Sequence, residues 1–258
     1  MRLFLLPKTY RGEETVTLTG KDYNYIVNVL RLKNKSRITG RDAKGNIYNL
    51  EITDIGPKSC TLSSTPTEEA CETTDALPQD RPVKPIVLYQ CLPKGRKAEE
   101  IIKRATEIGV TTIVLVKSRN VIADISGKEE SRLERYNSMI EEAIQQSGST
   151  VPTKVEGVID ISEVPSHFEK FQQDLNVKGV GIILHQEKLT ETQSTLAETL
   201  KDKPQAVGIL VGAEGGFTDK ECSDMTASGF KPVLLKTNIL RCETASIYAI
   251  SASQALIE

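Results

Sequence analysis

From Pro85 onward, short apolar runs alternate with stretches of helical periodicity, and this alternation limits the possible folds more than any other feature. Each apolar run is too short for a helix and has the length of a buried strand. The expected strands cover Ile86–Leu92, Thr112–Val116, Gly179–His185, Ala206–Val211 and Pro232–Leu235. The expected helices cover Lys97–Ile108, Glu129–Ser147, Thr190–Leu200, Asp219–Ala227 and Ser246–Ile257. Strands that alternate with helices predict an α/β fold in which helices cover both faces of a parallel sheet.

The N-terminal part follows a different pattern, in which short strands are separated by turn signals. One helical stretch, from Tyr23 to Leu32, interrupts them. The expected strands cover Leu3–Leu6, Thr15–Leu18, Ser36–Thr39, Ile47–Ile52 and Ser59–Leu62. We therefore predict a small β-barrel over residues 1–65, a linker rich in Thr, Glu, Asp and Pro over 66–84, and the α/β domain over 85–258.

The charge of the chain is balanced overall but uneven along its length. It contains 33 Lys and Arg against 35 Asp and Glu, so its net charge does not by itself indicate a nucleic-acid partner. Between residues 31 and 41, however, basic residues recur with no acidic residue among them, and Arg31, Lys33 and Arg37 belong to this stretch. Such a stretch is either a solvated strand edge or a surface that contacts nucleic-acid phosphates.

Cysteine and histidine usage argues against a metal site. The five cysteines are odd in number and form no Cys-X-X-Cys pair, which indicates a reducing compartment and no structural zinc. The two histidines, His167 and His185, lack the neighbour spacing of metal ligands. No apolar run approaches the length of a membrane span. We expect a cytoplasmic protein that binds neither a metal nor a membrane.

Two loops near the C-terminus carry the residue types of a ligand site. The first follows the strand Ala206–Val211 and reads Gly-Ala-Glu-Gly-Gly-Phe-Thr over residues 212–218. The second follows the next expected strand and contains Arg241-Cys242-Glu243-Thr244. Because open α/β sheets bind ligands at the carboxyl ends of their strands, both loops are candidates for one site. The structural alternatives are a tight turn before a capped helix and a helix N-terminus with Glu in its first turn.

The glycine loop does not have a phosphate-binding pattern. A Walker loop needs Lys-Ser or Lys-Thr after its last glycine, whereas Phe217-Thr218 stands there. The turn after the first strand of the α/β domain, Lys94–Lys97, lacks the glycines of a dinucleotide site. The kind of ligand that remains possible is neutral or cationic and is held by backbone groups. Glu214 is the acid in the loop. We expect Cys242 to be a small buried residue, since no histidine adjoins it in sequence.

Several blocks of the sequence, in their order and spacing, resemble the methyltransferases that modify N3 of a uridine in small-subunit ribosomal RNA. This family belongs to the trefoil-knotted SPOUT class. The matching blocks cover nearly the whole chain: residues 28–33, 92–95, 105–110, 118–119, 142–148, 151–152, 211–217 and 239–245. The resemblance implies a PUA- or OB-like N-terminal barrel that binds RNA, joined to a knotted α/β domain that binds S-adenosylmethionine. It also implies a homodimer in which both subunits shape the site.

The resemblance also assigns roles to residues of this sequence. It places the methyl donor among three loops formed by Leu184, His185, Gly212, Ala213, Glu214, Gly215, Gly216, Leu235, Lys236, Ile239 and Leu240. We hypothesise that the methyl group passes from the donor sulfonium to uridine N3, which must lose a proton. Arg241 or Arg119 would favour the negative charge that develops on the uracil. Glu243 would accept the proton or orient an arginine. Arg31, Lys33 and Arg37 would contact RNA phosphates.

Two departures from the family pattern leave an alternative function open. Ala213 stands where the family has Pro, and Lys236 stands where it has Gly. The alternative is a non-catalytic protein that binds RNA or the ribosome and keeps a degenerate knot domain. Binding of S-adenosylmethionine distinguishes the two, because a pure RNA-binding protein would show none. A nucleotide-binding α/β enzyme unrelated to methylation has the least support, for want of phosphate motifs.

Overall fold

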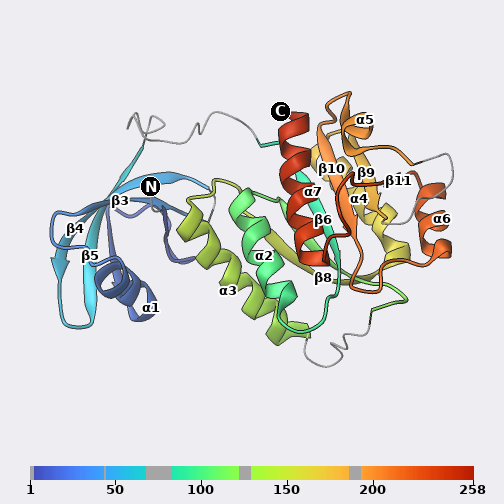
Figure 1. The fold of residues 1–258 in the computed structure, drawn as a ribbon. Helices are drawn as coiled ribbons and strands as arrows, with labels where there is room; N and C mark the ends of the chain where they lie inside the picture. The colour runs from blue at the N-terminus through green and yellow to red at the C-terminus, as the bar shows by residue number, and fades with distance from the viewer. Residues whose placement is uncertain (1–2, 44, 68–82, 122–128, 186–192) are drawn as a thin grey trace. The chain divides into compact units, whose positions relative to one another are not determined.

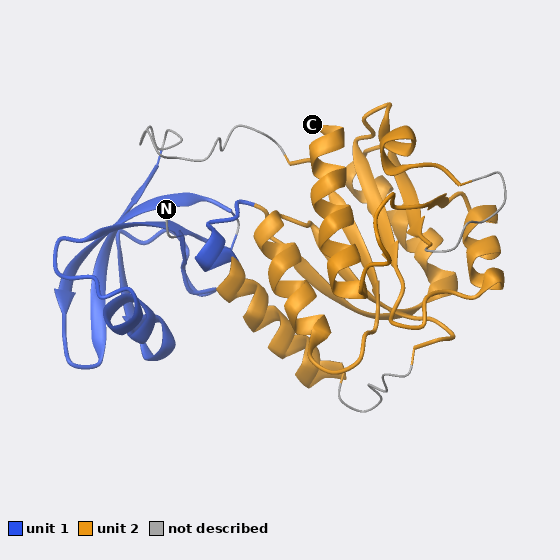
Figure 2. Cartoon of the chain, in the orientation of Figure 1, with its two compact units in different colours: residues 1–81, 144–150 blue, residues 82–143, 151–258 orange. Residues whose placement is uncertain are grey.

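The computed structural model describes residues 3–43, 45–67, 83–121, 129–185 and 193–258. The chain forms two compact units (Figures 1 and 2). Unit 1 contains residues 1–81 and 144–150, and unit 2 contains residues 82–143 and 151–258. The linker expected over residues 66–84 lies largely outside the described residues.

Unit 1 is built on a five-stranded sheet in the order β1-β3-β4-β5-β2. Its first and third strands pair in parallel, and the other neighbours are antiparallel. The strands are β1 (Leu3–Leu5), β2 (Thr15–Thr19), β3 (Arg37–Arg41), β4 (Ile47–Ile55) and β5 (Ser59–Pro66). Every strand expected from the sequence is present, and β4 and β5 run a few residues longer than the apolar pattern. Along β4 the side chains of Tyr48, Leu50 and Ile52 are buried, as the period of two along a strand requires.

The helix expected from Tyr23 to Leu32 is wrong in its bounds and partly in its type. It begins earlier, as α1 (Gly20–Tyr23), and continues as a π-helix (Asn24–Val29). It stops before Leu32 because Arg31 adopts a left-handed backbone conformation, with φ of 53°, which ends a helix. The basic stretch therefore begins at an irregular turn.

Unit 2 is an α/β domain with a six-stranded parallel sheet in the order β11-β9-β10-β6-β7-β8. Its strands are β6 (Ile86–Cys91), β7 (Thr112–Lys117), β8 (Lys154–Asp160), β9 (Gly179–Leu184), β10 (Ala206–Val211) and β11 (Lys231–Val233). Its helices are α2 (Lys97–Ile108), α3 (Glu129–Ser147), α4 (Val164–Leu175), α5 (Leu196–Leu200), α6 (Asp219–Ala227) and α7 (Cys242–Ile257), with a short 3₁₀ turn (Ile161–Glu163) before α4. The parallel sheet predicted from the alternation is confirmed.

Helices cover both faces of this sheet, and the side chains of β6 contact residues on each face. Tyr89 packs edge-to-face against Phe168 of α4 and against Phe230. Its neighbour Gln90 points to the other face, where its Oε1 accepts a hydrogen bond of 2.5 Å from Ser246 of α7. The helices α2 and α7 lie side by side on that second face (Figure 1). Because β6 is buried on both faces, its sequence is an unbroken apolar run except for Gln90.

Glycines in two strands make room for the aromatic rings of the first face. A Cβ atom at Gly179 or Gly208 would lie about 3 Å from the ring of Phe168. A Cβ at Gly181 would lie 2.9 Å from the ring of Phe230. The two rings therefore rest directly on the backbone of β9 and β10, at positions where any larger residue would collide with them.

The structure corrects the sequence expectations at three places in unit 2. The pattern predicts neither β8 nor α4. The helix expected over Thr190–Leu200 is only α5, because Thr195 caps its start and Ser194 pairs with Val233 in a β-bridge; residues 190–192 lie outside the described part. The last helix begins at Cys242 and not at Ser246, with Arg241 at its N-cap position.

Buried Arg41 ties the segment after α3 to unit 1. Its Nη1 donates hydrogen bonds to the carbonyl oxygens of Ser149 and Thr150, at 3.1 and 2.8 Å. Burial lowers the pKa of the guanidinium, and the adjacent carboxylate of Asp42 opposes this effect. These hydrogen bonds explain why residues 144–150 group with the N-terminal strands.

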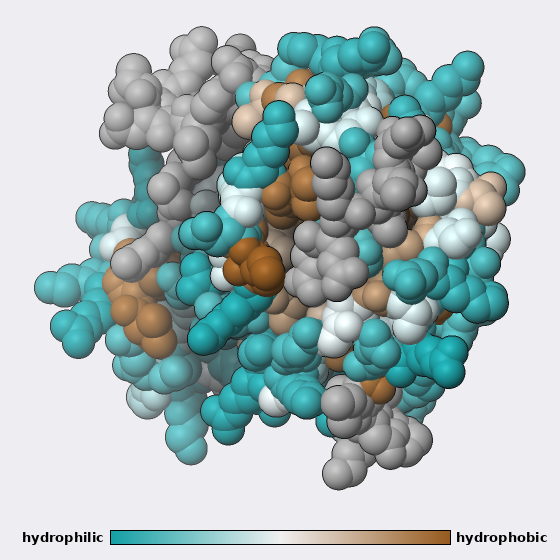
Figure 3. Space-filling model, turned by 45° about the vertical axis from the view of Figure 1, so that its right-hand side comes forward, coloured by the Kyte–Doolittle hydropathy of each residue, from teal (hydrophilic) through white to brown (hydrophobic). Residues whose placement is uncertain are grey.

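Some large apolar side chains remain at the surface. In unit 2 these include Ile239, which is 81% exposed, and Tyr248 of α7, which is 44% exposed. The space-filling view shows apolar side chains lying open between hydrophilic ones (Figure 3). Single exposed apolar residues are common, but two that lie on one helix and the loop leading into it can belong to a contact surface.

Candidate active site

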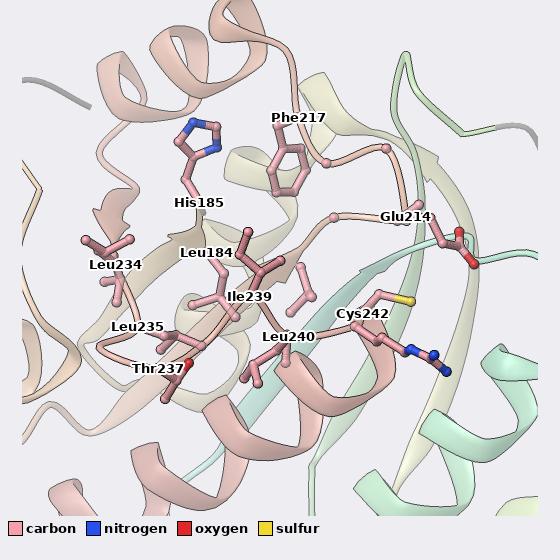
Figure 4. A pocket seen from close by; sticks show the side chains of 18 of the residues that line it. Leu184, His185, Glu214, Phe217, Leu234, Leu235, Thr237, Ile239, Leu240 and Cys242 are labelled. Atoms are coloured by element: carbon pink, nitrogen blue, oxygen red, sulfur yellow. The ribbon is translucent and has the colours of Figure 1, made fainter. Parts of the chain in front are cut away.

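A pocket of about 500 Å³ opens where β9, β10 and β11 end (Figure 4). It lies in unit 2, at the carboxyl edge of the parallel sheet. Its walls are the end of β9, the glycine loop (residues 212–217), the last loop (residues 234–241) and Lys97 at the start of α2. Figure 4 shows the apolar side chains of Leu184, Leu235, Ile239 and Leu240 gathered on one side and Glu214 on the other. This volume falls in the range of sites that enclose a small organic ligand.

The pocket brings together the residues that the resemblance assigns to the methyl donor, with one exception. Those that line it are Leu184, His185, Gly212, Ala213, Glu214, Gly215, Gly216, Leu235, Ile239 and Leu240. Lys236 is exposed and does not line the pocket, so its long side chain leaves the space open.

The three residues expected to act in catalysis are placed differently from one another. Arg241 lines the pocket, and its side chain is exposed. Glu243 is in the first turn of α7 and does not itself line the pocket, but its Oε2 lies 3.7 Å from Nζ of Lys97, which does. Arg119 does not line the pocket; its backbone N–H donates to Oε1 of Glu221 at 2.8 Å, and its side chain is exposed.

The residues expected to contact RNA lie in unit 1. Arg31, Lys33 and Arg37 are all exposed. Arg37 Nε also lies 2.8 Å from Oε2 of Glu51 on the neighbouring strand β4, so its charge is partly neutralised. The left-handed conformation recurs at Lys35, with φ of 67°. The first half of the basic stretch is thus an exposed, sharply turning segment, and its second half, from Arg37, is the strand β3, in which Arg41 is buried.

The glycine loop is a tight turn whose glycines are required by its shape. The Gly216 N–H donates to the carbonyl oxygen of Ala213 at 2.9 Å, and Gly216 has a φ of 61°, which side-chain-bearing residues rarely adopt. A Cβ at Gly212 would lie 3.2 Å from the Gly216 Cα, so the two arms of the turn lie against each other. The loop then enters α6 through a capping box between Thr218 and Glu221. Both the turn and the capped helix anticipated as structural alternatives exist, and they form one wall of the pocket.

Two family models match this chain. Residues 79–254 match the RNA methyltransferase domain, and residues 18–63 match the RNA methyltransferase PUA domain. The chain belongs to the RNA methyltransferase family. The fold class predicted for it, a SPOUT domain with a small N-terminal PUA-like unit, is confirmed.

Named relatives of this methyltransferase support the same assignment. The ribosomal RNA small subunit methyltransferase E of Synechocystis is 29% identical over 246 residues, which cover 95% of this chain and 75% of the relative. The Bacillus subtilis protein of the same name is 26% identical over 244 residues, with 92% and 89% covered. The crystal structure of ribosomal RNA small subunit methyltransferase E from Neisseria gonorrhoeae, bound to S-adenosyl methionine, has a TM-score of 0.79 and 26% identity, with 99% of this chain and 98% of that chain covered.

Three contacts from other elements hold the glycine loop of the methyltransferase in place. The Glu214 carboxylate accepts hydrogen bonds from the Lys94 backbone N–H, at 3.2 Å, and from Lys97 Nζ, at 2.8 Å. On the other side of the loop, Asn120 Nδ2 donates to the Gly215 carbonyl oxygen at 2.9 Å. Burial pushes the pKa of Glu214 upward, but the hydrogen bonds from Lys97 and from backbone N–H groups outweigh it and hold that pKa below its usual range. Glu214 is therefore ionised at neutral pH.

Cys242 and Glu243 form a second polar group at the start of α7. Cys242 is buried, as expected, and its Sγ donates to Glu243 Oε2 at 3.2 Å. Burial and the adjacent carboxylate raise the pKa of the Cys242 thiol to about 12, so it is not a thiolate at neutral pH. Burial also pushes the pKa of Glu243 upward, but hydrogen bonds from its own N–H and from Cys242, with the charges of Lys97 and Arg241, hold it below its usual range.

His185 carries a buried nitrogen without a partner. The residue is only 7% exposed, and its Nδ1 lies 3.4 Å from Sγ of Cys222. Within the part of the chain that the structure describes, its Nε2 has no hydrogen-bond partner. Buried polar atoms are nearly always paired, so this nitrogen is an exception, and it is closed off from the open space of the pocket.

Two residues that shape this site, Lys97 and Asn120, were not predicted from the sequence. A signal existed for each. Lys97 ends the segment Lys94–Lys97, which follows a strand of the predicted sheet, and Asn120 directly follows Ser118-Arg119 after another strand. Both segments lie at the carboxyl edge where the site was expected.

Among the described residues, no group of three or more His, Cys, Asp or Glu side chains is arranged to hold a metal ion. The described helices include none that is both long and apolar enough to cross a membrane.

Proposed function

We propose that this protein transfers the methyl group of S-adenosylmethionine to N3 of a uridine in small-subunit ribosomal RNA. One observation carries the proposal: the three loops that the resemblance assigns to the methyl donor enclose a single pocket in a chain of the RNA methyltransferase family. The names of the relatives and the S-adenosyl methionine bound to the Neisseria gonorrhoeae enzyme support the RNA and the donor. We assign RNA binding to residues 1–65 and methyl transfer to residues 85–258.

The residues of the pocket fit S-adenosylmethionine. Leu235, Ile239 and Leu240 give an apolar wall of the kind that holds a heterocyclic base, and the glycine loop offers backbone groups for close approach. His185 also lines the pocket, at the end of β9. Glu214, which is paired with Lys97, adds a carboxylate at the edge of the pocket. When bound, S-adenosylmethionine supplies a reactive methyl group on a positively charged sulfur.

The protein's own residues then have to manage one proton and one developing charge. The new bond forms between N3 and the methyl carbon as the carbon–sulfur bond breaks, and the N3 proton leaves. Arg241, at the pocket edge, would stabilise negative charge on the uracil oxygens. Glu243 is ionised at neutral pH and would accept the proton or orient Arg241. N3 lies on the pairing edge of the base, so the uridine has to be unpaired or flipped out to react.

The two departures from the family pattern do not close the site. Ala213 lines the pocket beside its glycine neighbours, and Lys236 points elsewhere. The pKa of Glu198 is lowered mainly by hydrogen bonds from Thr195, and the charge of Lys236 lowers it further. The structure therefore offers no support for the alternative of an RNA-binding protein that has lost its donor site.

The proposal extends to assembly and location. We propose a homodimer, as in the family that the sequence resembles, with the exposed Ile239 and Tyr248 as apolar residues that a second copy would cover. We propose the cytoplasm as its location, because the substrate is ribosomal RNA. The cysteines within the described ranges, Cys60, Cys91, Cys222 and Cys242, are all unbridged.

Donor binding and methyl transfer test the function together. We expect saturable heat when the protein is titrated with S-adenosylmethionine. We also expect transfer of labelled methyl groups to small ribosomal subunits taken from cells that lack this modification. The methyl group blocks the pairing edge of the base, so reverse transcription should stop at the modified uridine. RNA binding without donor binding would instead support the non-catalytic alternative.

Gly215→Ala is expected to weaken donor binding about tenfold. A Cβ at this position would lie 2.9 Å from Asn120 Cβ, so the glycine loop and the loop after β7 would have to move apart. A shift of that size in a pocket wall is enough to cost an order of magnitude in a positioned contact. The measurement is the calorimetric affinity for S-adenosylmethionine.

The matched control for Gly215→Ala is Gly157→Ala in β8. A Cβ at Gly157 would have no heavy atom within 4 Å, and its backbone is not left-handed. This variant should bind the donor as the wild-type protein does. Equal affinity in Gly215→Ala and the wild type would show that the Asn120 contact does not shape the donor site.

A further inference from the structure

Lys97 touches the two acidic groups at the edge of the pocket. It is the first residue of α2, and its Nζ lies 2.8 Å from Glu214 Oε1 and 3.7 Å from Glu243 Oε2. Glu214 belongs to the glycine loop and Glu243 to the first turn of α7. One ammonium group therefore connects two separate elements of the site through their carboxylates.

Each of the two carboxylates has other partners besides the Lys97 ammonium. Glu214 otherwise receives backbone N–H groups, including that of Lys94, and Glu243 receives its own N–H and the Cys242 thiol. The other cation that acts on Glu243 is Arg241. In return, the Glu214 hydrogen bond, with the charges of Glu214 and Glu243, raises the pKa of Lys97 against the opposing effect of burial. Lys97 is thus charged throughout the neutral range.

We propose that Lys97 is a positioning residue for methyl transfer: its ammonium fixes the glycine loop against the start of α7 by holding Glu214 and Glu243 together. The inference rests on the proposed function and adds a residue to it. Lys97 acts through the two carboxylates. Its charge adds to the hydrogen bonds that keep Glu243 ionised, and so able to accept the N3 proton, and it keeps Glu214 turned toward α2. Ion pairs at this degree of exposure contribute little to stability, so the effect falls on the reaction and not on the fold.

The first test compares Lys97→Met with Lys97→Arg across the pH range, using labelled S-adenosylmethionine and unmethylated small ribosomal subunits. We expect Lys97→Met to lower kcat about tenfold to a hundredfold. The loss should be larger at about pH 6 than at about pH 8, because without the ammonium the pKa of Glu243 rises and more of it is protonated at the lower pH. Lys97→Arg keeps the charge and should keep the shape of the wild-type pH profile.

The matched control is Lys103→Met. Lys103 lies on the same helix and also pairs with a glutamate, Glu142, at 3.2 Å, but it does not line the pocket. The Lys103→Met substitution should leave kcat and the pH profile unchanged. A wild-type kcat and pH profile in Lys97→Met would overturn the proposal. So would a loss that is uniform across pH and equal in Lys97→Arg, because it would show that Lys97 acts through packing alone.

A second readout does not depend on activity. The carboxylates can be titrated by NMR in protein labelled at the glutamate side chains, with signals assigned from Glu214→Gln and Glu243→Gln. Both groups should titrate at higher pH in Lys97→Met than in the wild type; unchanged titration would overturn the inference. If the titrations shift but the wild-type protein does not methylate RNA, the proposed function fails and the coupling of Lys97 to the carboxylates stands.

Discussion

Arg241→Ala is expected to reduce methyl transfer to RNA by about a hundredfold to a thousandfold, the cost of removing one group that stabilises developing charge. Arg241 lines the pocket with an exposed side chain, and it makes no capping hydrogen bond to α7 through that side chain. Its loss should therefore leave the helix intact. The measurement is the initial rate of methylation of small ribosomal subunits, with the affinity for S-adenosylmethionine measured separately by calorimetry.

Arg104→Ala is the matched control for this experiment. Arg104 is also exposed and belongs to unit 2, but it pairs with Glu100 along α2 and does not line the pocket. It should methylate at the wild-type rate. Full activity in Arg241→Ala would remove this residue from the mechanism and leave Arg119 as the candidate for stabilising the uracil charge.

Phe168→Ala is expected to destabilise unit 2 by about 3 to 5 kcal/mol, as truncation of a buried aromatic residue does. Phe168 is buried, and its ring rests on the backbone at Gly179 and Gly208 and against Tyr89 and Phe230. Because strand glycines cannot fill the space that the ring leaves, the cavity should persist. Urea denaturation followed by circular dichroism measures the change in the free energy of unfolding.

Phe171→Ala provides the comparison for Phe168→Ala. Phe171 stacks on Phe168 from the same helix, but it is only partly buried at the edge of the core. Its truncation removes less area from the interior and should cost clearly less. Equal costs for the two variants would contradict the assignment of Phe168 to the centre of this packing.

Much of unit 2 could be predicted from the sequence because its signals are local. The bounds of α2 and α6 match the expectation, since Gly109 adopts the left-handed conformation that ends α2 and Thr218 caps α6. The strand β10 matches because its apolar run is buried on both faces. In each case the deciding residues lie inside the element or directly beside it.

The elements that were missed depend on contacts far along the chain. β8 is an edge strand that is half exposed, so it has no continuous apolar run. The helix α4 buries only Val164 and Phe168, and Phe168 packs on glycines of strands that come later in the sequence. A glycine that receives a ring looks the same in a sequence as a glycine in a turn.

The residues of the site also divide into those with a local signal and those that depend on contacts far along the chain. The glycine loop and Arg241 were predicted because their residue types carry chemistry at the ends of strands. Lys97 was not, because its role requires β6 to pair with β10, which sets the end of one strand beside the loop that follows the other. The position of Lys97 after a strand indicated the right edge of the sheet, but the order of the strands, which brings it beside Glu214, is not recorded in any local pattern.

The hydrogen bonds from Arg41 make unit 1 a discontinuous domain. The chain passes between the units after residues 81, 143 and 150, and the segment between the last two completes the N-terminal unit. A single proteolytic cut in the linker would therefore not release unit 1 whole, because residues 144–150 would still be attached to unit 2. The two fragments would each hold part of one folded unit, which is the arrangement from which split-protein complementation can be built.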